Sequence, residues 1–491
     1  MQKTKKSRFV IPLILVFLSA ALIRLIDLDN PPLDFHPARQ LHSAILARGF
    51  YLDTGGYLQD KTKEYNHEAL MRGQFEPWIE PPVYEKITAG LYRIFGAADL
   101  RVPRITSIIF WILSAAVLSK LSYSLFGATG MFGSVCFFLF LPYGISASRS
   151  FQPDIIMVFL LILTMCCVHK YDPKSLKSAI LLGLLAGACI FIKQVAIFPL
   201  GLAIAASIIA KDGLKAAIKS KNTFIVAFLS LSPVLVYNIW GCFISGFLKQ
   251  QYQGRFFLSE LISPSFYVRW LRMVDSVFSV FLFVLALIGI LLIKNKNDRA
   301  AWIGYFSGYI LYGLVLPHHI GTHDYYQLLA FPLVAVGIGS VASSLFSHLP
   351  DKKAKTAAIV LSSGLCLWCA ADGVMTIHRT DYREWPDRWE RIASELEAYD
   401  DQIITIGLMN DYGAGMDYWG LKLPAIWDQN VENMGKDDAA GILKNTFRNY
   451  RYFIVTDLER FYQQRTLRDY IEDAAGVYEE GDDYIIYALK Q

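Results

Sequence analysis

Long stretches of apolar residues, separated by short polar segments, run along most of this chain. A helix of about 17 to 25 mostly apolar residues matches the bilayer core of roughly 30 Å. Such windows start near residues 9, 104, 129, 154, 176, 195, 223, 276, 300, 325 and 357. The pattern therefore predicts a polytopic α-helical membrane protein with about eleven transmembrane helices.

Basic residues precede the first window and follow the fourth, sixth, eighth and tenth. They are Lys3, Lys5, Lys6, Arg8, Lys170, Lys174, Lys177, Lys211, Lys215, Lys219, Lys221, Lys294, Lys296, Arg299, Lys352, Lys353 and Lys355. Because basic loops favour the cytoplasmic side, this bias predicts a cytoplasmic N-terminus, and an odd number of spans puts the C-terminus outside. The alternative for the first window is a cleaved signal peptide, since Ser19-Ala20-Ala21 offers small residues near its end.

Two polar regions interrupt the rhythm of short loops. Residues 28–103 contain amphipathic stretches at Gln40–Tyr51 and Tyr84–Phe95, with a Gly- and Tyr-rich turn at Thr54–Tyr57. These features indicate a structured outer loop with interfacial helices. The shorter region Lys249–Asp275 carries Arg255, Arg269 and Arg272 among aromatic residues, which is also typical of an interfacial helix.

The composition changes after the last window, where charged residues and Tyr become frequent and apolar runs become short. The strand candidates are Ile403–Ile406, Tyr452–Thr456 and Tyr484–Leu489, and the helix candidates are residues 387–398 and 459–473. We therefore expect two domains. Residues 1–379 form the transmembrane domain, with its large first outer loop at 28–103, and residues 380–491 form an extracytoplasmic α/β domain.

Composition and charge agree with a membrane protein. The chain is 54% hydrophobic and only 18% charged, and its net charge of +4 is too small for a nucleic-acid footprint. All seven cysteines lie in or beside the predicted spans, so no disulfide framework is implied. No glycine-rich nucleotide-binding loop follows a predicted strand.

Unusual polar residues gather at the predicted outer ends of the spans. They are Asp34, His36, Arg39, Glu80, Arg149, Asp154, Lys193, His318, His319, His323 and Asp324. Charges at a membrane boundary cost desolvation free energy, so such a group is a functional-site candidate. Cations hold a lipid-linked phosphate, and a carboxylate accepts the proton of an incoming hydroxyl. Sugar transfer from a polyprenyl phosphate has these requirements.

Several candidates have a structural alternative. Asp34 precedes a probable helix from Pro37, so its role can be that of an N-cap. Arg149 and Asp154 can be a snorkelling cation and a helix cap. Lys193 lies at an outer end, where cytoplasmic anchoring does not explain it, so an anion is its expected partner. His318 and His323 are either interfacial residues or loosely spaced metal ligands.

The order of several motifs resembles that of a known family. The motifs are the early outer Asp34, Glu80-Pro81-Pro82-Val83-Tyr84, Arg101-Val102-Pro103-Arg104, the segment from Arg149 to Asp154, Gly183 and Gly187 with Lys193, and His323 to Leu328 with Pro332. In this order they resemble membrane glycosyltransferases of the GT-C type. The resemblance covers residues 1 to about 375 and is nearest to family 39, the protein O-mannosyltransferases, the aminoarabinose transferases of lipid A and their bacterial relatives.

The resemblance implies an inverting transfer from a polyprenyl-phosphate sugar to a glycan, lipid or protein at the outer face of a bacterial cytoplasmic membrane. It implies that Asp34 is the general base, that Asp154 positions the substrates, and that Lys193 faces the donor phosphate. The other implied contacts are Arg149 and His323 to the phosphate, and His36, Arg39, Glu80, Tyr84, Tyr325 and Tyr326 to the substrates. No nucleotide or flavin is implied, and a divalent cation stays open.

One departure from the family pattern concerns the first loop. Relatives often have an Asp-Glu pair there, whereas Phe35 and His36 follow Asp34 in this chain. The division of roles between Asp34 and His36 therefore stays open. Two other functions share some of these features: a ligase or polymerase of lipid-linked glycans, and a flippase or transporter with charges along its pathway.

The C-terminal segment offers only weak functional candidates. Asp411-Tyr412, Asp417-Tyr418-Trp419 and Trp427-Asp428 pair aromatic rings with carboxylates. Aromatic faces stack on sugars, and carboxylates accept their hydroxyl hydrogens, so these residues can bind a carbohydrate. The interpretation that we favour is packing and turns.

Overall fold

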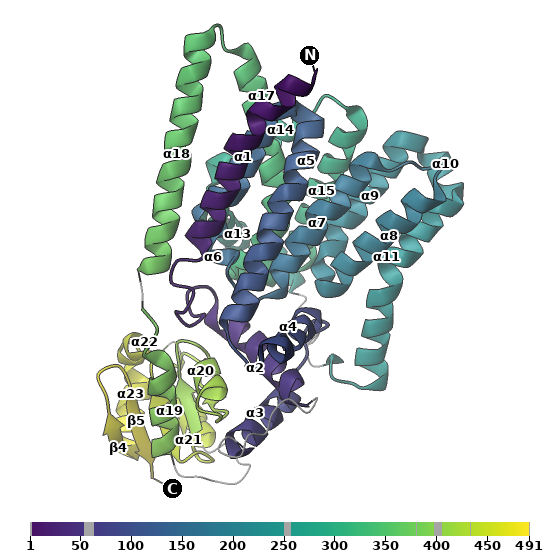
Figure 1. The fold of residues 1–491 in the computed structure, drawn as a ribbon. Coiled ribbons are helices and arrows are strands. Elements are labelled where there is room, and N and C mark those ends of the chain that lie inside the picture. The colour runs from purple at the N-terminus through teal and green to yellow at the C-terminus, as the bar shows by residue number, and fades with distance from the viewer. Residues whose placement is uncertain are drawn as a thin grey trace. The chain divides into compact units, whose positions relative to one another are not determined.

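The computed structural model describes residues 2–53, 63–249, 257–379, 381–396, 405–432 and 434–490. The chain forms two compact units, whose elements are labelled in Figure 1. The helical unit comprises Met1–Leu28, Pro77–Thr88 and Arg101–Thr380, and the mixed unit comprises Asp29–Glu76, Ala89–Leu100 and Asp381–Gln491. The mixed unit thus combines parts of the predicted first outer loop with the C-terminal segment.

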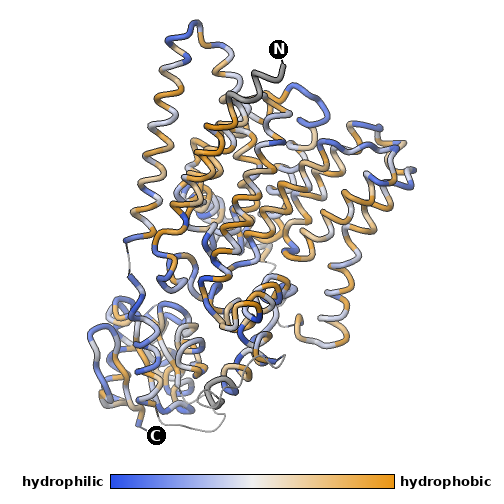
Figure 2. Tube along the Cα trace, viewed as in Figure 1, coloured by the Kyte–Doolittle hydropathy of each residue, from blue (hydrophilic) through white to orange (hydrophobic). Residues whose placement is uncertain are grey.

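Long apolar helices build the helical unit, and Figure 2 shows hydrophobic residues along them and hydrophilic residues at their ends. Its α-helices are α1 (Gln2–Arg24), α5 (Arg101–Phe140), α6 (Pro142–Ala147), α7 (Pro153–Lys170), α8 (Leu176–Ile192), α9 (Ile197–Asp212), α10 (Leu214–Lys219), α11 (Lys221–Ile239), α13 (Pro264–Phe278), α14 (Val280–Leu291), α15 (Lys296–Val315), α16 (Pro317–Thr322), α17 (Phe331–His348) and α18 (Lys352–His378). Helix α4 (Val83–Phe95) contributes to both units, and the shorter helical turns include η2 (Gln194–Ala196), η3 (Trp240–Ile244), η4 (Leu258–Ile262) and η5 (Asp324–Ala330).

The number of membrane spans is lower by a strict criterion than the sequence predicts. Within the described ranges, six helices are long and apolar enough to cross a membrane, or seven if α13 and α14, bent by 85°, count as one span. Phe9–Arg24 and α8 are shorter apolar helices. Every predicted window falls on a helix, but the number eleven stays a prediction.

Helix α5 turns back on itself at Gly127, which has a φ of 73° and a ψ of −165°. Trp111 and Phe138 stack with ring centroids 4.4 Å apart, and Trp111 Nε1 donates to the carbonyl of Phe138. In a straight helix these residues, 27 positions apart, would be separated by about 40 Å. The second and third predicted windows therefore form a helical hairpin.

Glycines let neighbouring helices approach backbone to backbone. A Cβ atom on Gly308 of α15 would lie 2.6 Å from the Cα of Pro199 in α9, and one on Gly337 of α17 would lie 2.7 Å from the Cα of Ala286 in α14. Small residues allow such close packing between membrane helices. These two contacts therefore exclude larger side chains.

Polar contacts tie together the end of the helical unit at which α7 terminates. His169 Nε2 lies 2.9 Å from Ser124 Oγ, and His169 Nδ1 lies 2.8 Å from Asp298 Oδ1. Lys211 Nζ donates to the carbonyls of Val168 and Tyr171, each at 2.8 Å. The last carbonyls of α7 thus have donors, and the ends of α5, α7, α9 and α15 are joined.

The mixed unit contains a five-stranded sheet in the order β2-β1-β3-β5-β4. Its elements are α2 (Pro37–Asp53), α3 (Lys63–Phe75), α19 (Trp385–Glu395), β1 (Thr405–Leu408), α20 (Ala414–Tyr418), β2 (Ala425–Ile426), α21 (Lys436–Phe447), β3 (Tyr452–Val455), α22 (Leu458–Gln463), α23 (Arg465–Ala474), β4 (Ala475–Glu480) and β5 (Ile485–Leu489). Strands β2, β1 and β3 are parallel, with Ile406 opposite Phe453, whereas β5 is antiparallel to β3 and β4. A buried cluster that includes Leu408, Phe447 and Phe453 forms the core.

The predicted α/β character of the C-terminal segment is confirmed. All three strand candidates correspond to β1, β3 and β5, and the two charged stretches correspond to α19 and to α22 with α23. The amphipathic stretches predicted within residues 28–103 are helices α2 and α4, and Arg269 and Arg272 lie on α13. Ile403 and Ile404, the turn at Thr54–Tyr57, and Arg255 lie outside the described residues.

The glycine contact between α9 and α15 makes a testable prediction. Gly308→Ala should lower the free energy of unfolding by about 1 to 3 kcal/mol, because its Cβ would press on the α9 backbone. Gly201→Ala in α9 is the control, since a Cβ there meets no atom within 4 Å. Because alanine has the better helix propensity, this variant should raise the free energy of unfolding by up to about 1 kcal/mol. Unfolding in detergent micelles measures both, and equal stabilities would contradict the close packing.

Candidate active site

A buried ammonium group lies between two carboxylates in the helical unit. Lys193 Nζ donates to Asp154 Oδ2 at 2.8 Å and lies 3.1 Å from Glu80 Oε1. The side chains of Lys193 and Asp154 are 3% and 1% exposed, whereas that of Glu80 is 19% exposed. Ion pairing offsets the desolvation cost of these buried charges. Three residues predicted for the site are therefore in direct contact.

Local sequence explains why these groups meet. Pro153 starts α7 and Gln152 is its N-cap residue, so Asp154 lies inside the first turn with its side chain on Lys193 rather than in the cap position. Helix α8 ends at Ile192, and Lys193 follows with extended backbone angles. Gly187 in α8 allows close packing on α11, because its Cβ would lie 3.4 Å from the Cα of Ser230.

Aromatic residues of η5 cover the same ammonium group. Lys193 Nζ lies 5.6 Å from the ring centroid of Tyr325 and 5.8 Å from that of Tyr326, distances typical of cation–π contacts. The ring of His323 lies 5.4 Å from that of Tyr325. Asp324 accepts a hydrogen bond of 3.0 Å from the hydroxyl of Tyr143. The predicted motif from His323 onward therefore reaches Lys193.

Three buried arginines of the helical unit lie near the start of the segment that the sequence predicts as the first outer loop. Arg24 donates to Ser148 Oγ at 2.6 Å and is fully buried. Arg149 donates to the carbonyl of Asp27 at 3.0 Å, and Arg104 donates to the carbonyl of Leu28 at 3.3 Å. Arg149 is only 1% exposed, so it does not snorkel to water. Its described contact holds the backbone that leads toward Asp34.

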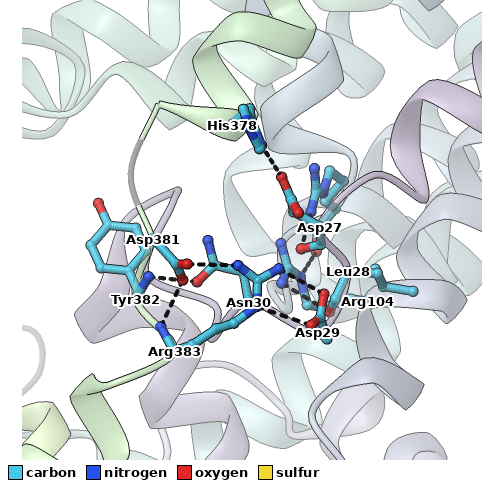
Figure 3. Close-up of polar contacts among 10 residues, drawn as sticks. Asp27, Leu28, Asp29, Asn30, Arg104, His378, Asp381, Tyr382 and Arg383 are labelled. Atoms are coloured by element: carbon cyan, nitrogen blue, oxygen red, sulfur yellow. Dashed lines mark hydrogen bonds and ion pairs between the residues drawn. The ribbon is translucent and has the colours of Figure 1, made fainter.

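Figure 3 shows further polar contacts made by residues 27–30 and by the segment from His378 to Arg383. In the helical unit, Asp27 has a φ of 47°, and its Oδ2 lies 2.5 Å from Nδ1 of His378 at the end of α18. In the mixed unit, Arg383 pairs with Asp29 at 3.0 Å and with Asp381 at 2.8 Å. His378, which the sequence places on the outer side, thus has a structural contact.

Asp34, His36 and Arg39 belong to the mixed unit and are half-buried. The carbonyl of His36 accepts hydrogen bonds from the amides of Arg39 and Gln40, as an N-cap carbonyl does. His36 rather than Asp34 therefore occupies the cap position of α2. His36 also has a φ of 47°, an unusual conformation for a residue other than glycine that costs about 1 to 3 kcal/mol.

Other predicted residues have different surroundings. Tyr84 is buried, and its hydroxyl donates to the carbonyl of Pro103 at 2.6 Å. His318 Nδ1 lies 3.3 Å from Glu260, which pairs with Arg269 at 2.5 Å. Within the described ranges, no group of three or more His, Cys, Asp or Glu side chains is arranged to hold a metal ion.

Two residues that contact candidates from the sequence, Asp324 and His318, were themselves missed from the sequence. Tyr143 directly follows a proline at the predicted outer end of the third window, which is a usable signal for a boundary residue. Glu260 is one of two acidic residues in the aromatic segment Lys249–Asp275, but no spacing rule links it to His318.

Residues 79–240 match a family model described as dolichyl-phosphate-mannose-protein mannosyltransferase. This range contains Glu80, Arg149, Asp154 and Lys193 but not Asp34 or the motif from His323 onward. No curated protein matches the chain.

Solved structures share the fold of the whole chain. ArnT from Cupriavidus metallidurans, bound to undecaprenyl phosphate, is 12% identical with a TM-score of 0.58, and the match covers 98% of each chain. The archaeal oligosaccharyltransferase AglB from Archaeoglobus fulgidus, in complex with an inhibitory peptide and a dolichol-phosphate, is also 12% identical with a TM-score of 0.58. That match covers 97% of this chain and 74% of AglB. The chain therefore shares the fold of these two structures, and residues 79–240 are similar to the protein mannosyltransferase family model. Its motif order resembles that of membrane glycosyltransferases of the GT-C type.

Proposed function

We propose that the protein transfers a sugar from a polyprenyl-phosphate donor to an acceptor at the outer face of the cytoplasmic membrane. The observation that carries this proposal is the buried Lys193, held by Asp154 and Glu80 and covered by Tyr325 and Tyr326. Undecaprenyl phosphate in ArnT and dolichol-phosphate in AglB support a sugar linked to a polyprenyl phosphate as the donor for this protein.

Lys193 is the proposed contact for the donor phosphate. With all three groups charged, two carboxylates and one ammonium carry a net charge of −1, which opposes the approach of an anion. Glu80 is the more exposed carboxylate, so we expect the phosphate to replace it on Lys193 while Asp154 keeps the ammonium in place. His323 and Arg149 are the further proposed phosphate contacts, and Tyr325 and Tyr326 supply rings on which a sugar stacks.

Asp34 is the proposed general base. The acceptor oxygen attacks the anomeric carbon, its proton passes to Asp34, and the bond from the anomeric carbon to the phosphate oxygen breaks. Polyprenyl phosphate then leaves with its charge stabilised by Lys193. A single in-line displacement inverts the anomeric configuration. His36 fixes the backbone beside Asp34, and His36, Arg39, Glu80 and Tyr84 stay proposed substrate contacts or supports of the site.

The proposed orientation puts Asp154 and Lys193 on the outer side. Helix α7 has Asp154 in its first turn and His169 in its last, so these groups lie at opposite ends of one helix. Lys211, in the last turn of α9, contacts the His169 end, and basic residues beside the membrane favour the cytoplasmic side. The N-terminus would then be cytoplasmic and the C-terminal segment outside, in a bacterial cytoplasmic membrane.

Replacement of the proposed base tests the reaction. Asp34→Asn should lower kcat about 100- to 10,000-fold, because the amide accepts no proton from the acceptor. Release of polyprenyl phosphate from a polyprenyl-phosphate sugar measures transfer, and thermal unfolding in detergent checks the fold. Asp53→Asn in α2 is the matched control and should retain full activity. Normal transfer by Asp34→Asn would remove Asp34 from the role of base.

Substitutions at Lys193 and Asp154 separate the contribution of Lys193 to stability from its contribution to donor binding. Lys193→Met should lower the free energy of unfolding by about 3 to 5 kcal/mol, because it leaves Asp154 buried without its cation. The double variant Lys193→Met/Asp154→Asn should regain most of that stability. It should still bind a polyprenyl-phosphate sugar about 10- to 100-fold more weakly, since a charged hydrogen bond is lost. Donor titration with unchanged affinity would contradict the phosphate contact.

A further inference from the structure

Two helices of the mixed unit cross at a pair of glycines. A Cβ atom on Gly49 of α2 would lie 2.7 Å from the Cα of Gly73 in α3. This close approach excludes any side chain at the crossing. Arg48 and Arg72 directly precede the two glycines, so both guanidinium groups extend from the point at which the helices are nearest.

Both arginines contact α20 of the C-terminal segment. Arg72 binds Asp417 through two hydrogen bonds, Nε to Oδ1 at 2.6 Å and an Nη to Oδ2 at 2.8 Å. Such bidentate pairs are stronger and more directional than single hydrogen bonds. Arg48 donates to the carbonyl of Tyr418 at 2.8 Å, and its guanidinium lies 4.0 Å from the centroid of the Tyr418 ring. Arg48 and Asp417 are 5% and 4% exposed.

Burial acts differently on the pKa values of the two partners of this ion pair. Burial lowers the pKa of Arg72, but the hydrogen bond and the charge of Asp417 outweigh this effect and raise it above its ordinary value. Burial also raises the pKa of the Asp417 carboxyl, and Arg72 offsets that effect only in part. Removal of either partner would therefore leave a costly buried group.

Helix α20 is itself fixed to the sheet. Asp411, shortly after β1, accepts hydrogen bonds from the amides of Gly413 at 3.0 Å and Gly415 at 2.9 Å. In doubly wound sheets, loops beyond the carboxyl ends of parallel strands bind ligands. Here the loop after β1 binds the arginines of α2 and α3.

A sugar-binding role for the C-terminal aromatic residues does not fit these positions. Asp411, Asp417, Tyr418, Trp419 and Trp427 are all buried, so their rings and carboxylates are occupied by the protein itself. These positions agree with the packing role that the sequence analysis favours. Tyr412 is exposed, but its neighbour Asp411 is used for the α20 turn.

We propose that Arg48 and Arg72, which we call the arginine clamp, hold α2 on the C-terminal segment and thereby position Asp34; this inference rests on the proposed function. Helix α2 begins at Pro37, three residues after Asp34, and Gln40 donates to the carbonyl of Phe35 at 2.6 Å. A tilt of α2 at the clamp moves the carboxylate that takes the proton. The C-terminal segment is thus a positioning element for the base.

The clamp is tested with a double variant that removes both charges. Arg72→Ala/Asp417→Ala leaves no buried unpaired ion, so the protein should fold. We expect kcat to fall about 10- to 100-fold, since a displacement near 1 Å has this effect, while the KM for the polyprenyl-phosphate donor stays unchanged. Arg72→Lys, which keeps the charge but not the bidentate geometry, should recover part of the loss.

Arg468→Ala is the matched control, because Arg468 forms a partly exposed ion pair with Glu472 at 3.7 Å in the same unit. Hydrogen exchange of the full-length protein should rise at least tenfold in α2 of the double variant and stay unchanged in the control. Unchanged exchange in α2 would overturn the clamp whether or not transfer is detected. A normal kcat of the double variant together with faster exchange in α2 would overturn the positioning role. If the protein without substitutions transfers no sugar, the proposed function itself is refuted.

Discussion

The pairing of Lys193 with Asp154 and Glu80 is the constraint around which the helical unit is arranged. Moving a charged group out of water costs several kcal/mol even after relaxation, so a lysine with 3% side-chain exposure requires carboxylates at contact distance. That requirement joins the end of α8, the first turn of α7 and the segment before α4. The aromatic residues of η5 then cover the cation and complete the proposed site for an anionic lipid substrate.

Buried arginines serve a different purpose from this lysine. Arg24, Arg104 and Arg149 donate to backbone carbonyls or to a serine hydroxyl among their described contacts. A guanidinium has five donors in a fixed plane, so it can satisfy several carbonyls at a chain turn. These residues hold the exit from α1, which leads toward Asp34, and a role in binding phosphate would require them to keep that contact or exchange it.

Much of the fold is predictable from local sequence, because the spacing of apolar residues in a window or an amphipathic stretch indicates which helix faces are buried. Each predicted apolar window and each amphipathic stretch predicted within residues 28–103 is helical in the structure. The predicted site residues Asp154 and Glu80 both contact Lys193. Strand β2 has only two residues and β4 is mostly exposed, so neither has a readable pattern. The contact of Arg72 with Asp417 joins positions 345 residues apart, and no local sequence pattern predicts such a long-range contact. The left-handed backbone of His36 is equally invisible in composition.

The separation of Arg72 from Asp417 along the chain has a consequence for biosynthesis. Ribosomes add about 5 to 20 residues per second, so the partner of the first loop is made tens of seconds after the loop itself. During that interval the loop exists without the helix that holds it. A chain that ends before α20 has every apolar window in place but lacks Asp417 and Tyr418. Under the proposed mechanism, such an interrupted product would insert in the membrane without a positioned Asp34.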